Sequence, residues 1–377
     1  MRWVTLSWVG LLCACGGSPA AVLDGGPDSG PPIPPPPAPE IGRGDHTASS
    51  VTFSVIAEQD LLGPRDLAFN PLAPDELWIV NHDDESAVIV HGASTDGRSS
   101  ERRKDGYALH FMAKPASIDF GASETTIGKP GTFATCGESR NTYDDTKPPN
   151  DFMGPVLWSS DPSVFAMLNP KGLGSHLDML HLSPNCVGIA HEDANVFWTL
   201  SGLRKAVTRY DFRSDNGIGN DDHTDGKAWQ YATGEVGYKP GVSSHLYWSS
   251  DEKKLYVADA GNGRVVRIDP STATQGPKLP TSEPMALAVR MDGATVEEIV
   301  PPGTLTTPSG IELRGGIVYI SDNETSRISA YSRDGKLLNW LDTGLAPGSL
   351  SGIVFGPDNR LYFVDVRAGR VLRVDPK

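Results

Sequence analysis

Apolar and polar residues alternate with a period of two in several segments near the C-terminus. The clearest segments are 255–270, 317–335 and 361–376, which read LYVADAGNGRVVRIDP, IVYISDNETSRISAYSRDG and LYFVDVRAGRVLRVDP. Each has an alternating run, an aspartate, a short polar or glycine-containing turn, an arginine five residues later and a second alternating run. Such alternation on both sides of a turn predicts a β-hairpin. The matched residues are Asp259/Arg264, Asp322/Arg327 and Asp365/Arg370.

A further alternating segment precedes each hairpin, and these segments read SSHLYWSSDEKK, PSGIELRGG and LSGIVFGPDNR. Three strands with a fourth in the spacer make a four-stranded antiparallel meander, which is the blade of a β-propeller. Weaker copies lie at 63–92, 114–141 and 183–212. We therefore predict an all-β fold with six four-stranded antiparallel blades. Residues 51–59 should close the ring by pairing with the last blade, which otherwise has an open edge.

The repeats allow a comparison with a known family. The Asp-x-Gly-Asn-x-Arg-Val pattern at 259–265 and the PSGI and LSGI openings resemble NHL repeats of a six-bladed β-propeller covering residues 50–377. This fold class includes regucalcin and gluconolactonase-like hydrolases, the peptidyl-hydroxyglycine amidating lyase and many pure binding modules. The resemblance therefore implies a fold without choosing an activity.

The metal-binding patterns of those enzymes do not carry over. The hydrolases place asparagine in a turn before an innermost strand, but the turns at 308–310 and 350–352 read Pro-Ser-Gly and Leu-Ser-Gly. The lyase uses histidines in Pro-His-x-hydrophobic turns, and Ser243-Ser244-His245-Leu246 is similar but displaced by one residue. The resemblance thus leaves open whether the protein is an enzyme.

The N-terminus indicates export. MRWVTLSWVGLLCAC has an early arginine, an apolar run too short to span a bilayer, and small residues. Leu12-Cys13-Ala14-Cys15 resembles the lipobox of bacterial lipoproteins, which implies a signal peptide at 1–14 and lipidation of Cys15. Gly16 fits sorting to the outer membrane of the cell envelope, and an ordinary secretory signal is the alternative. The proline-rich segment that follows predicts an extended tether over 15–49.

Charge and cysteine content narrow the possibilities. The formal net charge of −14 excludes nucleic acid as a partner, because phosphates would be repelled. Four cysteines are present, and two of them lie in or directly after the signal peptide. The remaining two, Cys136 and Cys186, are predicted to form a disulfide in an oxidising compartment.

One histidine-rich segment, GSHLDMLHLSPNCVGIAHE at 174–192, is a candidate metal site. We expect it at the approach to the third blade's innermost strand, near the mouth of the central channel. His176, Asp178 and His181 would then converge on a divalent cation, with His245 contributing from the next blade. Imidazole and carboxylate ligands suit zinc, although hydrogen-bonding loop histidines are the plainer interpretation. His191-Glu192 is expected at the surface, in a turn beyond the strand.

The acidic loop at 210–226, YDFRSDNGIGNDDHTDG, raises the alternative of calcium. Its spacing does not match the EF-hand pattern, so a solvated loop is favoured. Together these features predict a membrane-tethered extracytoplasmic propeller that binds a small molecule, peptide or protein at one face. The alternative hypothesis is a metal-dependent hydrolase or lyase with its site at the channel mouth.

Overall fold

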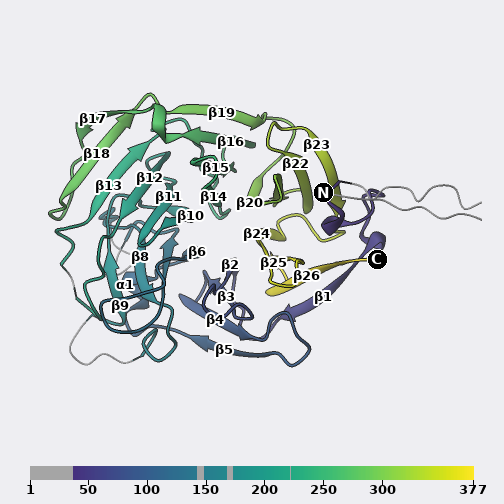
Figure 1. Ribbon diagram of the computed structural model, residues 1–377, viewed down its shortest axis with the longest axis horizontal. Helices are drawn as coiled ribbons and strands as arrows, with labels where there is room; N and C mark the ends of the chain where they lie inside the picture. The colour runs from purple at the N-terminus through teal and green to yellow at the C-terminus, as the bar shows by residue number, and fades with distance from the viewer. Residues whose placement is uncertain (1–36, 142–147, 168–172, 221) are drawn as a thin grey trace, which may run out of the picture. The chain divides into compact units, whose positions relative to one another are not determined.

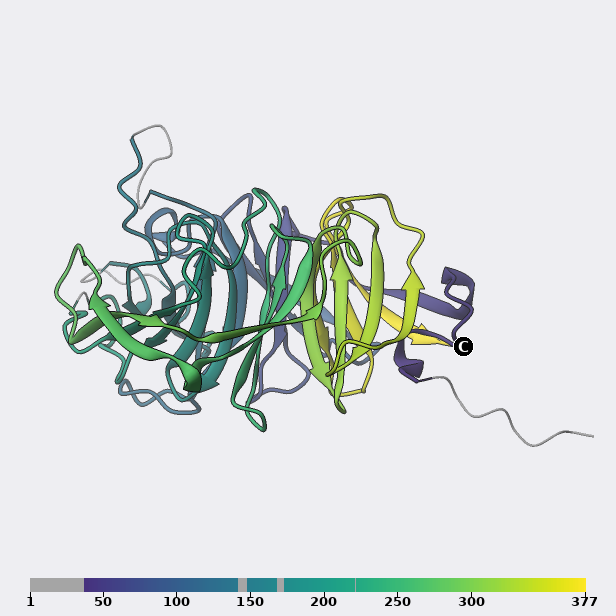
Figure 2. The same ribbon diagram turned by 90° about the horizontal axis from the view of Figure 1, so that it is seen from above.

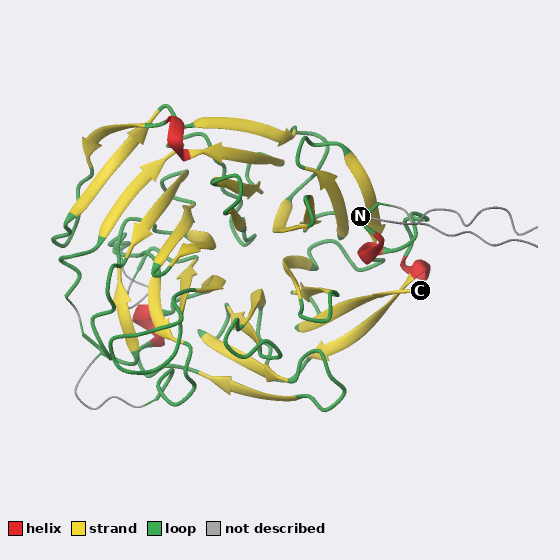
Figure 3. Cartoon of the chain, in the orientation of Figure 1, coloured by secondary structure: helices red, strands yellow, loops and turns green. Residues whose placement is uncertain are grey.

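Six β-sheets surround a common axis in the computed structural model, which describes residues 37–141, 148–167, 173–220 and 222–377 (Figure 1). The fold is all-β, and helices are few and short (Figure 3). These helices are η1 (Pro39–Ile41), η2 (Ala48–Ser50), α1 (Ala108–Phe111) and η3 (Pro270–Thr272). The predicted six-bladed propeller is confirmed. The predicted signal peptide, Cys15 and the tether up to residue 36 lie outside the described residues.

The first three sheets follow in chain order, each from its innermost strand outward. The first sheet contains β2 (Pro64–Phe69), β3 (Leu77–Asn81), β4 (Ser86–His91) and β5 (Ser99–Arg103). The second contains β6 (Pro115–Phe120), β7 (Thr132–Gly137), β8 (Val156–Ser159) and β9 (His176–Met179). The third contains β10 (Cys186–Asp193), β11 (Val196–Ser201), β12 (Ala206–Asp211), β13 (Lys227–Tyr231), β18 (Leu287–Asp292) and β17 (Thr274–Lys278).

The last three sheets complete the ring. The fourth contains β14 (Leu246–Ser249), β15 (Lys254–Asp259), β16 (Arg264–Asp269) and β19 (Thr295–Val300). The fifth contains β20 (Pro308–Arg314), β21 (Ile317–Asp322), β22 (Arg327–Ser332) and β23 (Leu337–Asp342). The sixth contains β24 (Leu350–Phe355), β25 (Leu361–Asp365), β26 (Arg370–Pro376) and, outermost, β1 (Val51–Ala57).

The N-terminal strand closes the ring as predicted. β1 pairs antiparallel with β26, with Val51 opposite Pro376 and Val55 opposite Leu372. Figure 2 shows the purple N-terminal strand beside the yellow C-terminal one. β1 thereby covers the edge that β26 would otherwise expose.

The packed region begins earlier than the predicted boundary at residue 50. Ala38 and Ile41 are each 1% exposed and belong to the apolar cluster between the fifth and sixth sheets. The Tyr319 hydroxyl donates a hydrogen bond of 2.8 Å to Glu40. The Asn339 side-chain amide donates one of 3.1 Å to the carbonyl oxygen of Ala38. Residues 38–50 are therefore part of the domain.

The apolar core lies in the gaps between neighbouring sheets. Six clusters are present, and the buried strand residues of each come from two adjacent sheets. Trp78, Phe133 and Trp158, none of them accessible to solvent, fill the gap between the first and second sheets. Ile79 and Tyr362 belong to the gap between the first and sixth sheets. Every sheet is thus buried on both faces, and the ring has no open side.

The repeated hairpins have the predicted register, with one difference in their ion pairs. In the first and third aspartate–arginine pairs, Nε of arginine lies 3.0 Å from Oδ2 of aspartate. In the second, Arg327 lies opposite Asp322 but contacts Asp342 at 3.6 Å. Asp322 accepts a hydrogen bond of 2.6 Å from the backbone N–H of Thr306 instead. All three hairpins therefore have the same turn register, whereas the aspartate–arginine ion pair forms in only two of them.

The third sheet is larger than predicted. The chain between β16 and β19 forms η3 and the hairpin β17–β18, and this hairpin joins the sheet of the preceding blade. β18 runs parallel to β13, with Lys227 opposite Leu287. An insertion in the fourth blade thus extends the third sheet to six strands.

The second blade requires a correction. His176–Met179 forms β9, the outermost strand of the second sheet, so it does not lie near the mouth of the channel as expected. β8 and β9 have only four residues each, and long connections separate them from their neighbours. Strands this short carry little alternation, and unlike β14, which a tight turn joins to β15, they are not marked by a neighbouring turn.

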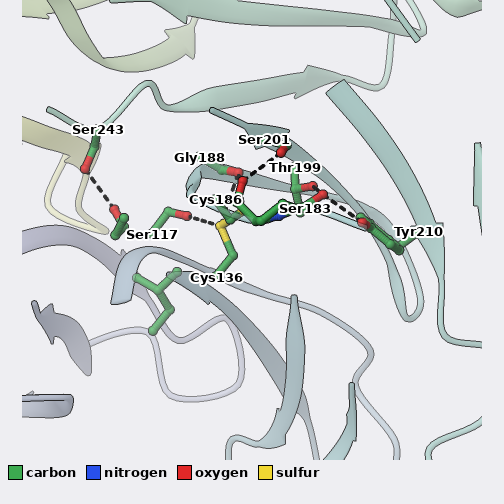
Figure 4. The surroundings of a disulfide bond; sticks show 12 residues. Ser117, Cys136, Ser183, Cys186, Gly188, Thr199, Ser201, Tyr210 and Ser243 are labelled. Carbon is green, nitrogen blue, oxygen red and sulfur yellow. Dashed lines mark hydrogen bonds between the residues drawn. A yellow bond between two sulfur atoms is a disulfide. The ribbon is translucent and has the colours of Figure 1, made fainter. Parts of the chain in front are cut away.

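The predicted disulfide joins Cys136 and Cys186, whose Cα atoms are 5.5 Å apart (Figure 4). Cys136 lies on β7, and Cys186 begins β10 in the neighbouring blade. The bond spans a sequence separation of 50 residues. Closing such a loop stabilises by roughly 4 kcal/mol in the chain-entropy model.

No helix in the described part of the chain has both the length and the apolar character needed to cross a bilayer.

Candidate functional site

The six innermost strands place two layers of side chains around the axis. Their sequences align from residues 64, 115, 186, 243, 308 and 350, and alternate positions face the same side of a strand. The third positions are Asp66, Ser117, Gly188, His245, Gly310 and Gly352. The fifth positions are Ala68, Asp119, Ala190, Tyr247, Glu312 and Val354.

The third-position layer is the narrow part of the channel. A Cβ atom on Gly188 would clash with the carbonyl oxygen of Ser244 in the next sheet. A Cβ on Gly310 would clash with that of Ser351. Only glycine allows neighbouring backbones to approach this closely.

Asp66 and His245 meet across this narrow layer. They come from the first and fourth sheets, and His245 Nδ1 lies 3.0 Å from Asp66 Oδ1. Asp66 Oδ2 also accepts a hydrogen bond of 3.0 Å from the backbone N–H of Ile118. His245 Nε2 is buried and has no hydrogen-bond partner among the described residues. The pair forms a floor across the axis.

A second group of polar contacts covers the channel where the innermost strands begin. The Arg65 guanidinium donates to the carbonyl oxygen of Gly241, which comes from the opposite side of the ring. Glu138 accepts hydrogen bonds from the Tyr238 hydroxyl at 2.6 Å and from the Gly241 N–H at 2.7 Å. These contacts and the Asp66–His245 pair together close the channel at the face where the innermost strands begin.

Towards the opposite face the channel widens into a cavity of about 360 Å³. The fifth-position residues line its wall, and aromatic residues line it where the innermost strands end. These aromatic residues are Phe69, Tyr247, Trp248 and Phe355. The cavity is a blind pocket that opens at the face where the innermost strands end.

The pocket wall is acidic. Asp119 accepts backbone hydrogen bonds from Phe120 at 2.8 Å and His191 at 2.7 Å, and burial raises its pKa. Burial, followed by repulsion from Asp119, raises the pKa of Glu312 to about 8. Burial and the nearby Glu312 raise the pKa of Tyr247 to about 12. Each shift favours the neutral form of the group, and burial is its largest cause.

The four residues predicted to bind a metal do not form one group. His245 belongs to the channel floor, whereas the other three lie on or next to β9 at the outside of the ring. The His176 ring stacks on Phe111 with ring centroids 3.7 Å apart, and burial lowers its pKa to about 4. His223 contacts both Asp178 and His181. It was not among the metal ligands predicted from the sequence.

Several residues of the channel were placed elsewhere or not selected in the sequence analysis. His191 was expected at the surface in a turn beyond the strand, but it lies within β10, is half-buried and lines the pocket. Asp66, Asp119 and Glu312 were not selected, although each is an acidic residue inside an otherwise mostly apolar innermost strand. A charged residue in such a strand is a signal for the channel wall, since the neighbouring positions pack against other blades.

No protein-family model matches the sequence, and no curated protein matches it. Solved structures share the fold at low identity. A luciferin-regenerating enzyme is 16% identical with a TM-score of 0.54, covering 86% of this chain and 95% of that chain. An auxiliary nutrient binding protein from Bacteroides thetaiotaomicron is 13% identical with a TM-score of 0.53, covering 83% and 69%. Regucalcin from Agrobacterium tumefaciens, a calcium-binding protein, is 13% identical with a TM-score of 0.50, covering 87% and 96%. These likenesses support the propeller fold and do not assign an activity.

Proposed function

We propose that the protein binds a small cationic molecule in the blind pocket, at the face where the innermost strands end. The observation that carries this proposal is the pair of acidic side chains in the pocket wall. Asp119 and Glu312 come from opposite sheets, and among the described residues neither forms a salt bridge, although attraction by His191 and by Arg314 partly opposes the rise in the pKa of Asp119 and of Glu312. A cationic ligand can supply the direct partner that both carboxyl groups lack.

The aromatic residues of the pocket strengthen this proposal. Tyr247 is partly exposed and lines the same cavity as the carboxyl groups, whereas the Trp248 ring already stacks on Trp198 and Arg314 lies over the Phe355 ring. Aromatic faces attract cations by about 0.5–2 kcal/mol, depending on desolvation. A ligand with an ammonium group on a compact ring or chain satisfies both features. The Bacteroides thetaiotaomicron neighbour is an auxiliary nutrient binding protein, and a small-molecule ligand agrees with that likeness.

A charge series tests the proposal. Tyramine, 4-hydroxyphenylethanol and 4-hydroxyphenylacetate share a scaffold and differ in charge, and benzylamine, benzyl alcohol and benzoate form a second such set. Titration calorimetry at pH 7.5 should show tighter binding of at least one amine than of both its neutral and anionic counterparts. Equal or weaker binding of the amines in both sets would contradict the proposal.

A second candidate function is a hydrolase or lyase acting on the bound molecule, and the floor of the pocket favours it. Asp66 orients His245 so that the unpartnered Nε2 is available as a general base. Among the described residues, the donor atoms of the channel do not form a compact metal-binding set. His245→Asn should leave amine binding intact while abolishing any conversion of the bound amine detected by mass spectrometry.

Glu312 should make stability depend on pH. Its pKa is about 8 in the folded protein, compared with an ordinary value of 4.5. Between these values the folded state retains a proton that the unfolded chain has lost, so the free energy of unfolding falls as pH rises. Glu312→Gln removes this penalty. Urea unfolding at pH 5, 7 and 8.5 should show the variant gaining stability relative to wild type with each step. A difference that stays constant with pH would show that Glu312 is not held protonated.

We also propose that the propeller is a tethered lipoprotein of the outer membrane, built from NHL-type repeats. The support is the lipobox-like Leu12–Cys15 segment, the proline-rich residues after it and the Asp-x-Gly-Asn-x-Arg-Val pattern. A tethered pocket would hold a captured small molecule at the membrane surface.

The tether is tested through its thiol. Acylation requires Cys15, so Cys15→Ser should move the protein from the membrane fraction to the soluble fraction, with the propeller still folded. Mass spectrometry of the wild-type protein should show the added lipid on Cys15. A variant that stays with the membrane, together with an unmodified wild-type cysteine, would exclude lipidation.

A further inference from the structure

A cluster of two histidines and a glutamate lies at the outside of the ring, away from the channel. His181 follows β9, His223 lies between β12 and β13, and Glu283 lies in the β17–β18 connection. His181 Nε2 and His223 Nε2 are 3.3 and 3.8 Å from Glu283 Oε2. One donor atom from each residue lies within 4.8 Å of the other two. Three separate segments therefore converge on one point.

These distances suit a shared cation. Zinc lies about 2.0–2.1 Å from nitrogen and oxygen ligands in tetrahedral geometry, which separates neighbouring ligand atoms by about 3.3 Å. The separation of 3.3 Å already has that value, and the separation of 3.8 Å needs to shorten by about 0.5 Å. Imidazole and carboxylate are ligands that zinc and similar first-row metals accept.

The burial of His181 provides a second observation. His181 is 7% exposed, and neither of its ring nitrogens has a hydrogen-bond partner among the described residues. Glu283 Oε2 is also buried without a hydrogen-bond partner, although its distance to His181 is short. The Phe152 ring stacks on His181 with centroids 3.5 Å apart and fixes the plane of the imidazole. Buried polar atoms without partners are rare, and one metal ion would satisfy His181 Nε2 and Glu283 Oε2.

Asp178 contacts the ring nitrogen of His223 that faces away from Glu283. Its Oδ1 lies 2.7 Å from His223 Nδ1, and Asp178 is inaccessible to solvent. A carboxylate that accepts the Nδ1–H leaves the Nε2 lone pair directed toward Glu283. This carboxylate–histidine pairing accompanies histidine ligands in metal sites, where it fixes the tautomer and the ring orientation.

We propose that His181, His223 and Glu283 bind one zinc-class divalent cation, with Asp178 positioning His223 and water completing the coordination. The cation joins the β17–β18 hairpin to the second and third sheets. The site is independent of the proposed amine pocket, because β9 and β17 are the outermost strands of their sheets.

The experiment uses the full-length protein, stripped with a chelator and titrated with Zn²⁺ against a chromophoric competitor. One equivalent should bind, and Co²⁺ should give the visible absorption of a site with nitrogen ligands. His181→Ala and Glu283→Gln should weaken Zn²⁺ binding at least 100-fold, and Asp178→Asn about 10–100-fold. His91→Ala is the matched control, since His91 also lies beside two glutamates, Glu76 and Glu101, outside this cluster.

Two outcomes would overturn the proposal. One is the absence of saturable binding of one equivalent, which would leave a plain His181–Glu283 ion pair. The other is Zn²⁺ affinity in Glu283→Gln equal to that of wild type. Glu283 has a 39% exposed side chain, so this variant should stay folded when His181→Ala does not. Tyramine titration of the stripped protein separates the two proposals, because amine binding should be unchanged without the metal.

Discussion

A protein that begins at Asp60 is expected to lose most of its folding stability, whereas one that begins at Pro36 should keep it. Deleting β1 exposes the edge of β26 and uncovers the cores on both sides of the sixth sheet. Val51, Ile56 and Ala57 are each less than a tenth exposed in the closed ring. Burying a valine or isoleucine contributes about 1.5–3 kcal/mol, and whole domains are stable by only about 5–15 kcal/mol.

Circular dichroism melting and light scattering would measure this effect. A protein that begins at Gly42 is the useful intermediate, because it keeps β1 but lacks Ala38 and Ile41. It should melt between the other two. Equal melting temperatures for the proteins that begin at Pro36 and Asp60 would show that β1 does not close the ring.

The double variant Asp119→Asn with Glu312→Gln should lower the affinity for the amine selected in the charge series by 100-fold or more. The substitutions keep the size of both side chains and remove both possible negative charges. A hydrogen bond to a charged group contributes about 1.5–3 kcal/mol, so losing two such contacts gives a reduction of this order. Calorimetric titration at pH 7.5 measures the change.

The matched control is Asp96→Asn, which removes a carboxylate from an exposed loop outside the pocket. Its amine affinity should equal that of wild type. If the control and the double variant lose the same modest amount, the effect comes from the net charge of the protein. The pocket would then not be the binding site.

The propeller could be predicted because its strands are mostly regular and its turns repeat. In the last three blades a four-residue turn joins strands of five to seven residues, so the alternation is long enough to detect. The residue before each of their turn arginines has a left-handed backbone, as at Gly263 with φ 61° and Gly369 with φ 61°. The same local requirement therefore leaves a recognisable residue pattern in each copy.

The strands that were missed lack this local information. β8 and β9 are short and lie between long connections, and the β17–β18 hairpin joins the sheet of another blade. Its pairing with β13 is parallel, so no tight turn in the sequence marks it. Only the packing of the whole ring determines where this hairpin lies.

The residues of the candidate sites, like the strands, could be predicted from the sequence only in part. The segment around His181 was recognised from its composition, but its partners His223 and Glu283 lie in two distant loops. The acidic residues of the pocket were visible in their strands, yet their common direction depends on how the strands are aligned around the axis. The disulfide was predictable because only two cysteines remained and adjacent blades are neighbours in the ring.

Proton release on amine binding is the sharpest test of whether the acidic pocket binds a cation. Glu312 has a pKa of about 8 in the empty pocket and is therefore mostly protonated at pH 7. A bound ammonium group favours the carboxylate, so binding should release about one proton per ligand. Calorimetry of the selected amine at pH 7, in buffers of different ionisation enthalpy, counts these protons, with Glu312→Gln as the comparison. We expect the wild-type protein to release about one proton per bound amine and Glu312→Gln to release much less. Binding of the amine with no proton released, or with the same number in both proteins, would contradict it.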